Sequence, residues 1–117
     1  MMITMKKVNS VLFPLLLLCA VIMILTHPKP FTKEQRTIIR QSDSVMYVTV
    51  WPEDSVVLRT PCADLTPVEL KSKDLKTLMA KMLATVRAPQ HDGVGIAAPQ
   101  VGISKRIICL QRFDKDG

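Results

Sequence analysis

The sequence predicts an α+β fold in which short strands surround one amphipathic helix. Between residues 75 and 86, apolar residues recur at spacings of three and four, which places them in one stripe along a helix. Residues 45–51 and 106–111 are instead rich in β-branched or other apolar residues, as strands are. With only 117 residues, the chain has room for one small domain at most.

The helix is the most clearly predicted element. Ser72 suits its N-cap, and Asp74 suits the first turn, where a carboxylate interacts favourably with the helix dipole. Pro89 ends the helix at or before Ala88. Six apolar residues form the stripe that should face the core: Leu75, Leu78, Met79, Met82, Leu83 and Val86.

The remaining elements are short. Residues 34–40 could form a helix, residues 45–51 are predicted as a strand, and residues 55–58 as a second extended piece. Residues 106–111 are apolar on both faces, which is typical of a buried strand. Residues 114–117 then resemble the turn of a hairpin.

The N-terminal segment, residues 1–26, is predicted to be a signal peptide or a membrane anchor. Lys6 and Lys7 precede an apolar block of 18 residues, Val8–Leu25. As a helix the block would be about 27 Å long, against about 30 Å for the hydrocarbon core of a bilayer, so both readings stay open. The protein is therefore expected to be membrane-anchored or exported. A cytoplasmic protein is the alternative if translation starts at Met46.

Residues 27–44 are predicted to be a linker with a short helix, because the proline-rich segment 27–30 cannot continue a helix. Residues 45–117 then form the domain. The net charge is +6, but basic residues are interspersed with acidic ones and only 4% of residues are aromatic. Nucleic acid is therefore not an expected partner.

The three cysteines, Cys19, Cys62 and Cys109, form no CxxC pair. A disulfide between Cys62 and Cys109 could form only in an exported domain, and their spacing gives it no support. Cys62, His91 and Cys109 also match no spacing of metal ligands. No residue is therefore assigned to a metal.

Residues 93–100 read GVGIAAPQ, a run of small residues beside one neutral carboxamide, Gln100. This composition allows another backbone to come very close. The pattern G-x-G-x-x-A within it also fits a dinucleotide-binding loop, but no strand precedes it and Pro99 prevents a following helix. A plain glycine-rich turn is the other alternative.

The segment 93–102, followed by Arg106 and two isoleucines, resembles the first motif of the peptide deformylases. These enzymes are metal hydrolases that remove the formyl group from N-formylmethionine. The order of strand, loop, amphipathic helix and motif from residue 45 to 117 is also similar to that family. The resemblance implies a partial peptide deformylase-like fold whose second half is absent.

The resemblance also implies roles for individual residues. Gln100 would hold the metal-bound water and the formyl oxygen, since a carboxamide donates hydrogen bonds without losing a proton. The backbone N–H of Ile96 would be a second donor to the oxyanion. Gly93, Val94 and Gly95 would line the cleft in which an N-formylmethionyl peptide lies as an added strand.

The family's metal, usually iron(II) with zinc or nickel as substitutes, is held by the Cys of an EGCxS motif and the two His of an HExxH helix. This sequence contains neither motif. The chain is therefore expected to be the N-terminal fragment of a peptide deformylase and to be inactive alone. A membrane-anchored, non-catalytic peptide-binding module is the alternative function.

Overall fold

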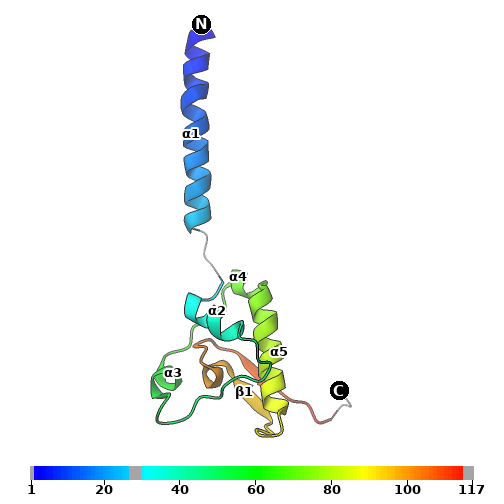
Figure 1. Ribbon diagram of the computed structural model, residues 1–117. Coiled ribbons are helices and arrows are strands. Elements are labelled where there is room, and N and C mark those ends of the chain that lie inside the picture. The colour runs from blue at the N-terminus through cyan, green and yellow to red at the C-terminus, as the bar shows by residue number, and fades with distance from the viewer. Residues whose placement is uncertain (1, 27–29, 115–117) are drawn as a thin grey trace.

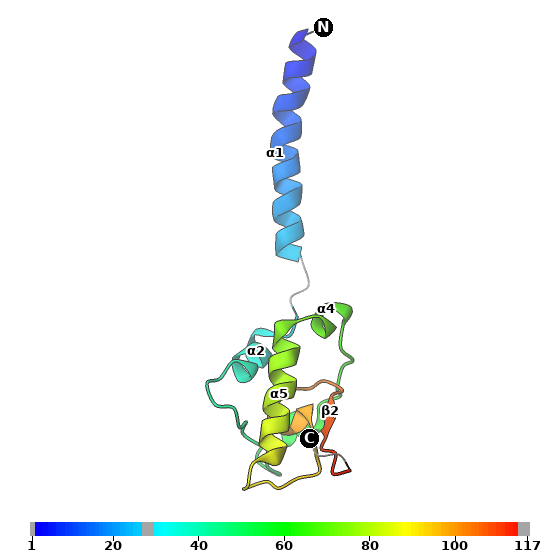
Figure 2. The ribbon, with the colours of Figure 1, turned by 90° about the vertical axis from the view of Figure 1, so that its right-hand side faces the viewer.

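The computed structural model describes residues 2–26 and 30–114 of the chain, and the side chains of residues 10–25 and 30–114 (Figure 1). It contains helices and a two-stranded sheet, so the predicted α+β fold is confirmed. Figures 1 and 2 show α5 alongside the sheet, with α2 packed against α5. The extended break predicted at 27–30 and the turn predicted at 114–117 lie almost wholly outside the described residues.

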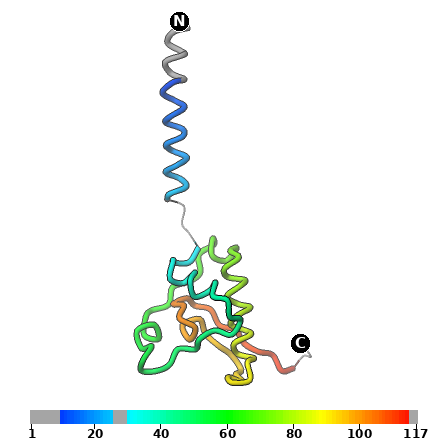
Figure 3. The backbone as a smooth tube through the Cα atoms, viewed as in Figure 1, coloured from blue at the N-terminus to red at the C-terminus, as the bar shows by residue number. Residues whose placement is uncertain are grey.

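The first helix, α1 (Met2–Thr26), projects away from the other elements (Figures 1 and 3). Its side chains are exposed from residue 10 to residue 25. Within the described residues, none of the helices is both long enough and apolar enough to cross a membrane.

The helix α2 (Lys33–Ile39) forms where a short helix was predicted. Its N-cap Thr32 accepts a hydrogen bond from Gln35 N (3.2 Å), and the Gln35 side chain accepts one from Thr32 N (3.0 Å). Phe31 and Ile39 are 3% and 0% exposed, respectively. The segment predicted to be a linker therefore contributes two large side chains to the core.

The amphipathic helix α5 (Lys73–Arg87) is confirmed, including its N-cap. The Ser72 hydroxyl accepts a hydrogen bond from Leu75 N (3.1 Å). Four residues of the predicted stripe are buried and a fifth, Leu83, packs against them; the four are Leu75, Leu78, Met82 and Val86. Met79 was wrongly placed in the core, because it lies at the margin of the stripe and is 48% exposed.

The strand predicted at residues 45–51 does not form. The segment is extended, but two of its amide groups donate to a side chain of α5 and to a main-chain carbonyl of the segment 98–101, and not to a neighbouring strand. Met46 N donates to Thr85 Oγ1 (2.8 Å), and Thr49 N donates to Gln100 O (2.7 Å). A strand here would require a second strand that pairs in register with residues 45–51. Among the described residues, no strand pairs with this segment.

Residues 55–58, predicted as extended, are helical. They belong to α3 (Ser55–Arg59), a short helix ended by a hydrogen bond from Thr60 N to Val56 O (3.0 Å). The Arg59 guanidinium lies 4.7 Å from the centre of the Trp51 ring, which stabilises this helix against the segment before it.

The sheet consists of β1 (Gly95–Ala97) and β2 (Ile108–Leu110), which pair antiparallel. The strand predicted at 106–111 is therefore confirmed, but its burial is not. Ile108 and Leu110 are each 71% exposed, because among the described residues β2 has only β1 as a strand partner and α5 packs on one side of the pair.

A buried carboxylate joins three segments of the fold. Glu69, in the short helix α4 (Pro67–Leu70), is 4% exposed. It accepts hydrogen bonds from Thr66 N (2.9 Å), from Phe31 N (3.2 Å) and from Lys105 Nζ (3.0 Å). Burial raises the pKa of Glu69, but the donors Thr66 N, Lys105 and Phe31 N together lower it below its usual range.

We expect Glu69→Gln to destabilise the protein by about 3 kcal/mol at pH 7, because it leaves the Lys105 ammonium, whose side chain is only 11% exposed, without its counter-ion. Since the folded pKa of Glu69 is lowered, its stabilising effect is present above the unfolded pKa of about 4.3 and is lost as pH falls through the folded pKa. The difference between wild type and variant should therefore shrink in acid. Urea unfolding at pH 7 and at pH 3 measures both effects.

Asp64→Asn is the matched control, because Asp64 forms an exposed ion pair with Arg106 (3.1 Å). It should leave the free energy of unfolding nearly unchanged. Equal losses in the two variants, or a loss in Glu69→Gln that does not change with pH, would contradict this account of Glu69.

Candidate functional site

The small-residue segment folds as strand β1 followed by the 3₁₀ helix η1 (Ala98–Val101). Pro99 fits the first turn of η1, where no backbone N–H is required. Gly102 ends the helix with φ +86°, in the left-handed region that glycine adopts readily. Gly102 N donates to Pro99 O (3.0 Å).

The glycines of this segment are needed by the chain's own packing. A Cβ on Gly95 would lie 2.6 Å from Leu110 Cδ2 and 3.0 Å from Cys109 O, and a Cβ on Gly93 would lie 2.9 Å from Val86 Cγ2. The sequence predicted that another backbone comes very close here. In the structure, β2 and the end of α5 come that close.

Gln100 is exposed, and its side chain folds back over η1. Its Oε1 accepts a hydrogen bond from Ala97 N (2.8 Å). Because a backbone N–H is the donor, the carboxamide oxygen must point inward and the NH₂ group outward. Among the residues that the structure describes, Gln100 Nε2 has no hydrogen-bond partner. The side chain is therefore held as a donor.

The backbone N–H of Ile96 does not suit the role that the resemblance gave it. Ile96 lies opposite Cys109, and Ala98 N, two residues further along, donates to Ile107 O (2.9 Å). Hydrogen-bonded pairs occur at every second position of an antiparallel ladder, so Ile96 and Cys109 also form such a pair. The Ile96 N–H is directed to β2, away from the open edge of β1.

The open edge of β1 belongs instead to Gly95 and Ala97. By the same alternation, their N–H and C=O groups point away from β2. Ala97 N–H is used by Gln100, whereas the backbone groups of Gly95 have no partner within the described part of the chain. Val94, beside them, is 64% exposed. This edge can accept one further extended strand.

Thr49 was not predicted to belong to the site, yet it donates hydrogen bonds to two main-chain carbonyl groups of η1. Its N–H donates to Gln100 O (2.7 Å) and its hydroxyl donates to Pro99 O (3.3 Å). Thr49 lies about fifty residues before its partners, and no local pattern connects it to them.

The residues that the structure describes do not form a metal site. Over residues 2–26 and 30–114, no three His, Cys, Asp or Glu side chains lie close enough to share an ion. Cys62 and Cys109 are free thiols. Burial raises the pKa of Cys109, which favours the protonated thiol over the thiolate that metals bind.

The sequence profile of the polypeptide deformylases matches residues 45–117. The chain belongs to the polypeptide deformylase family. It is 38% identical over 58 residues to the peptide deformylase of Leptospira biflexa, covering 50% of this chain and 31% of that protein. It is 45% identical over 59 residues to the peptide deformylase of Roseiflexus sp., covering 50% of this chain and 29% of that protein.

A crystal structure of class I type b peptide deformylase from Acinetobacter baumannii is similar in fold. It superimposes with a TM-score of 0.52 at 41% identity, over 58% of this chain and 43% of that one. The chain thus spans about a third of the length of the curated deformylases that it matches.

We expect Gly95→Ala to destabilise this deformylase segment by about 1–3 kcal/mol, because the added methyl group would overlap Leu110 and Cys109 O. The measurements are urea unfolding and hydrogen exchange of the β2 amides, which should lose protection. The control, Val94→Ala, changes an exposed side chain and should alter stability by no more than about 0.5 kcal/mol. Equal effects of the two substitutions would show that β2 does not pack this closely.

Proposed function

We propose that this chain forms the peptide-binding and oxyanion-stabilising part of a peptide deformylase, which hydrolyses the formyl group from N-formylmethionyl peptides. Membership of the family supports the reaction class. The orientation of Gln100 supports the part that this segment plays in the reaction. In this proposal residues 45–117 are the deformylase-like domain and residues 1–26 are a separate signal or anchor segment.

The proposed role of Gln100 is to donate a hydrogen bond to the formyl oxygen. Hydrolysis of the formyl amide places negative charge on that oxygen, and a donor fixed in advance stabilises this charge best. The bond from Ala97 N holds the carboxamide so that its NH₂ faces outward. One such donor typically contributes about 2.7–4 kcal/mol to transition-state stabilisation.

The peptide is proposed to lie along the open edge of β1. The N–H and C=O groups of Gly95 would bond to its backbone as to an added strand. Gly93 and Val94 would line the same cleft, with the exposed Val94 side chain against the peptide. The free groups of Gly95 replace Ile96 N–H as the backbone contribution of this strand.

The complete protein is proposed to use a metal ion, as its family does, with iron(II) expected and zinc or nickel as substitutes. The described residues of this chain do not fit such an ion. The roles proposed for Gln100 and for the edge of β1 depend only on hydrogen bonds that these groups can form themselves.

The test combines the chain with a polypeptide that carries the EGCxS and HExxH motifs of the family, together with iron(II). Formate release from a formyl-Met-Ala-Ser peptide is then measured. We expect Gln100→Ala and Gln100→Glu each to lower kcat by about 10²–10³-fold. Gln100→Glu is the sharper variant, because it keeps an oxygen that accepts from Ala97 N and replaces the NH₂ donor by a negatively charged oxygen that cannot donate to the formyl oxygen.

Gln90→Glu is the matched control, since it makes the same chemical change at an exposed position outside the motif. It should leave kcat unchanged. Undiminished formate release by both Gln100 variants would refute the role of Gln100. Binding of the formyl peptide at Gly95, followed by NMR, without formate release in any mixture would favour the non-catalytic peptide-binding module.

A further inference from the structure

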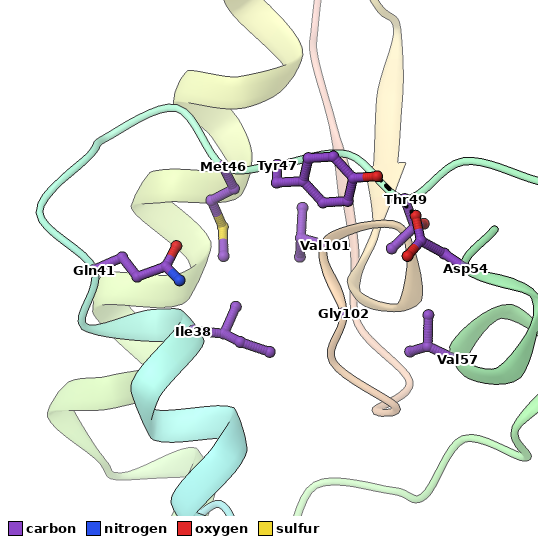
Figure 4. Close-up of a pocket in the computed structure, with 9 residues that line it drawn as sticks. All are labelled: Ile38, Gln41, Met46, Tyr47, Thr49, Asp54, Val57, Val101 and Gly102. Carbon is purple, nitrogen blue, oxygen red and sulfur yellow. Dashed lines mark hydrogen bonds between the residues drawn. The ribbon is translucent and has the colours of Figure 1, made fainter.

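A cavity of about 340 Å³ lies beside the C-terminal end of η1 (Figure 4), and no residue of β1 lines it. Its walls come from α2, from the extended segment 46–49, from α3 and from the end of η1. The α2 wall lies outside residues 45–117, which match the family profile. The cavity is therefore formed where the N-terminal part of this chain packs against its deformylase segment.

Most of the wall is apolar. Ile38, Met46, Val57 and Val101 surround the cavity in Figure 4, and Met46 and Val101 are 7% and 3% exposed. Met46 and Val101 belong to the hydrophobic core and Ile38 packs against it, so this part of the wall is backed by packed side chains. A volume near 340 Å³ is at the lower end of the range of small-molecule sites.

One end of the cavity carries a negative charge. Asp54 Oδ2 accepts hydrogen bonds from the Tyr47 hydroxyl (2.9 Å) and from Val50 N (2.8 Å), as Figure 4 shows for Tyr47. Its second oxygen, Oδ1, has no partner among the described side chains and backbone groups. No basic side chain lines the cavity. This end can therefore accept one more donor, and a cation suits it best.

We propose that this cavity binds a small molecule that has a short apolar chain and a primary ammonium group. The chain would lie against Ile38, Val57 and Val101, and the ammonium group would donate to Asp54 Oδ1. This site is distinct from the peptide edge of β1 and does not depend on the proposed deformylase function.

Binding here would also reach Gln100. Thr49 lines the cavity and donates to Gln100 O (2.7 Å), and Gly102 lines it where η1 ends. A ligand that contacts Thr49 and Gly102 therefore contacts a residue that binds the main-chain carbonyl of Gln100 and the residue that ends η1. The Gln100 side-chain NH₂ signals provide a second readout of occupancy.

The full 117-residue chain is titrated with hexylamine, hexanol and hexanoate, and binding is followed by ¹H–¹⁵N shifts of Thr49 and Gly102. We expect hexylamine to bind most tightly and hexanoate least. Asp54→Asn should weaken hexylamine about tenfold and leave hexanol unchanged, because it removes the charge and keeps an oxygen for Val50 N. Val57→Trp should fill the cavity and abolish binding of all three.

Asp64→Asn is the control for charge, because it removes one exposed carboxylate that does not line the cavity and should leave all affinities unchanged. The proposal is overturned if no probe shifts Thr49 and Gly102, if hexanoate binds as tightly as hexylamine, or if Asp54→Asn has no effect on hexylamine. Circular dichroism shows whether Val57→Trp folds, and the Asp54→Asn comparison decides the question if it does not.

Discussion

The buried carboxylate of Glu69 is the interaction on which the arrangement of this chain depends. It holds Phe31 N, Thr66 N and the Lys105 ammonium at one point. Phe31 has φ +61°, a conformation that a bulky residue adopts only when its surroundings impose it. Arg36 Nη1 donates to Phe31 O (2.9 Å) and completes that support. The position of α2 follows from this junction.

Lys105 connects this junction to the segment that contains β2. Lys105 precedes β2, and the neighbouring Arg106 N donates to Ala63 O (3.0 Å), which fixes where β2 begins. The register of β2 against β1 then decides which backbone groups face inward. The N–H and C=O groups of Ile96 point toward β2, whereas those of Gly95 point toward the open edge of β1. The ion pair of Glu69 and Lys105 thus holds the segment that leads into the strand whose register decides which backbone groups of β1 stay free.

The elements that depend on residues close together in the sequence could be predicted from the sequence. The stripe and N-cap of α5, and the break at Pro99 and Gly102, could all be found from the sequence, because each depends on residues within a few positions. The segment 45–51 could not, since its partners Thr85 and Gln100 lie about forty or fifty residues away. The orientation of the Ile96 N–H depends on strand register, which composition does not encode. Glu69 resembled any solvated carboxylate in the sequence, and only its burial reveals its importance.

Both carbonyl groups of Gln100 are already engaged, the main-chain one by Thr49 and the side-chain one by Ala97. The side-chain NH₂ group is therefore the hydrogen-bonding group of Gln100 that is wholly unused among the described residues. A neutral amide placed in this way favours ligands that present a lone pair to these hydrogen atoms. Because no proton is gained or lost there at ordinary pH, this selectivity should be the same in mildly acidic and mildly alkaline surroundings.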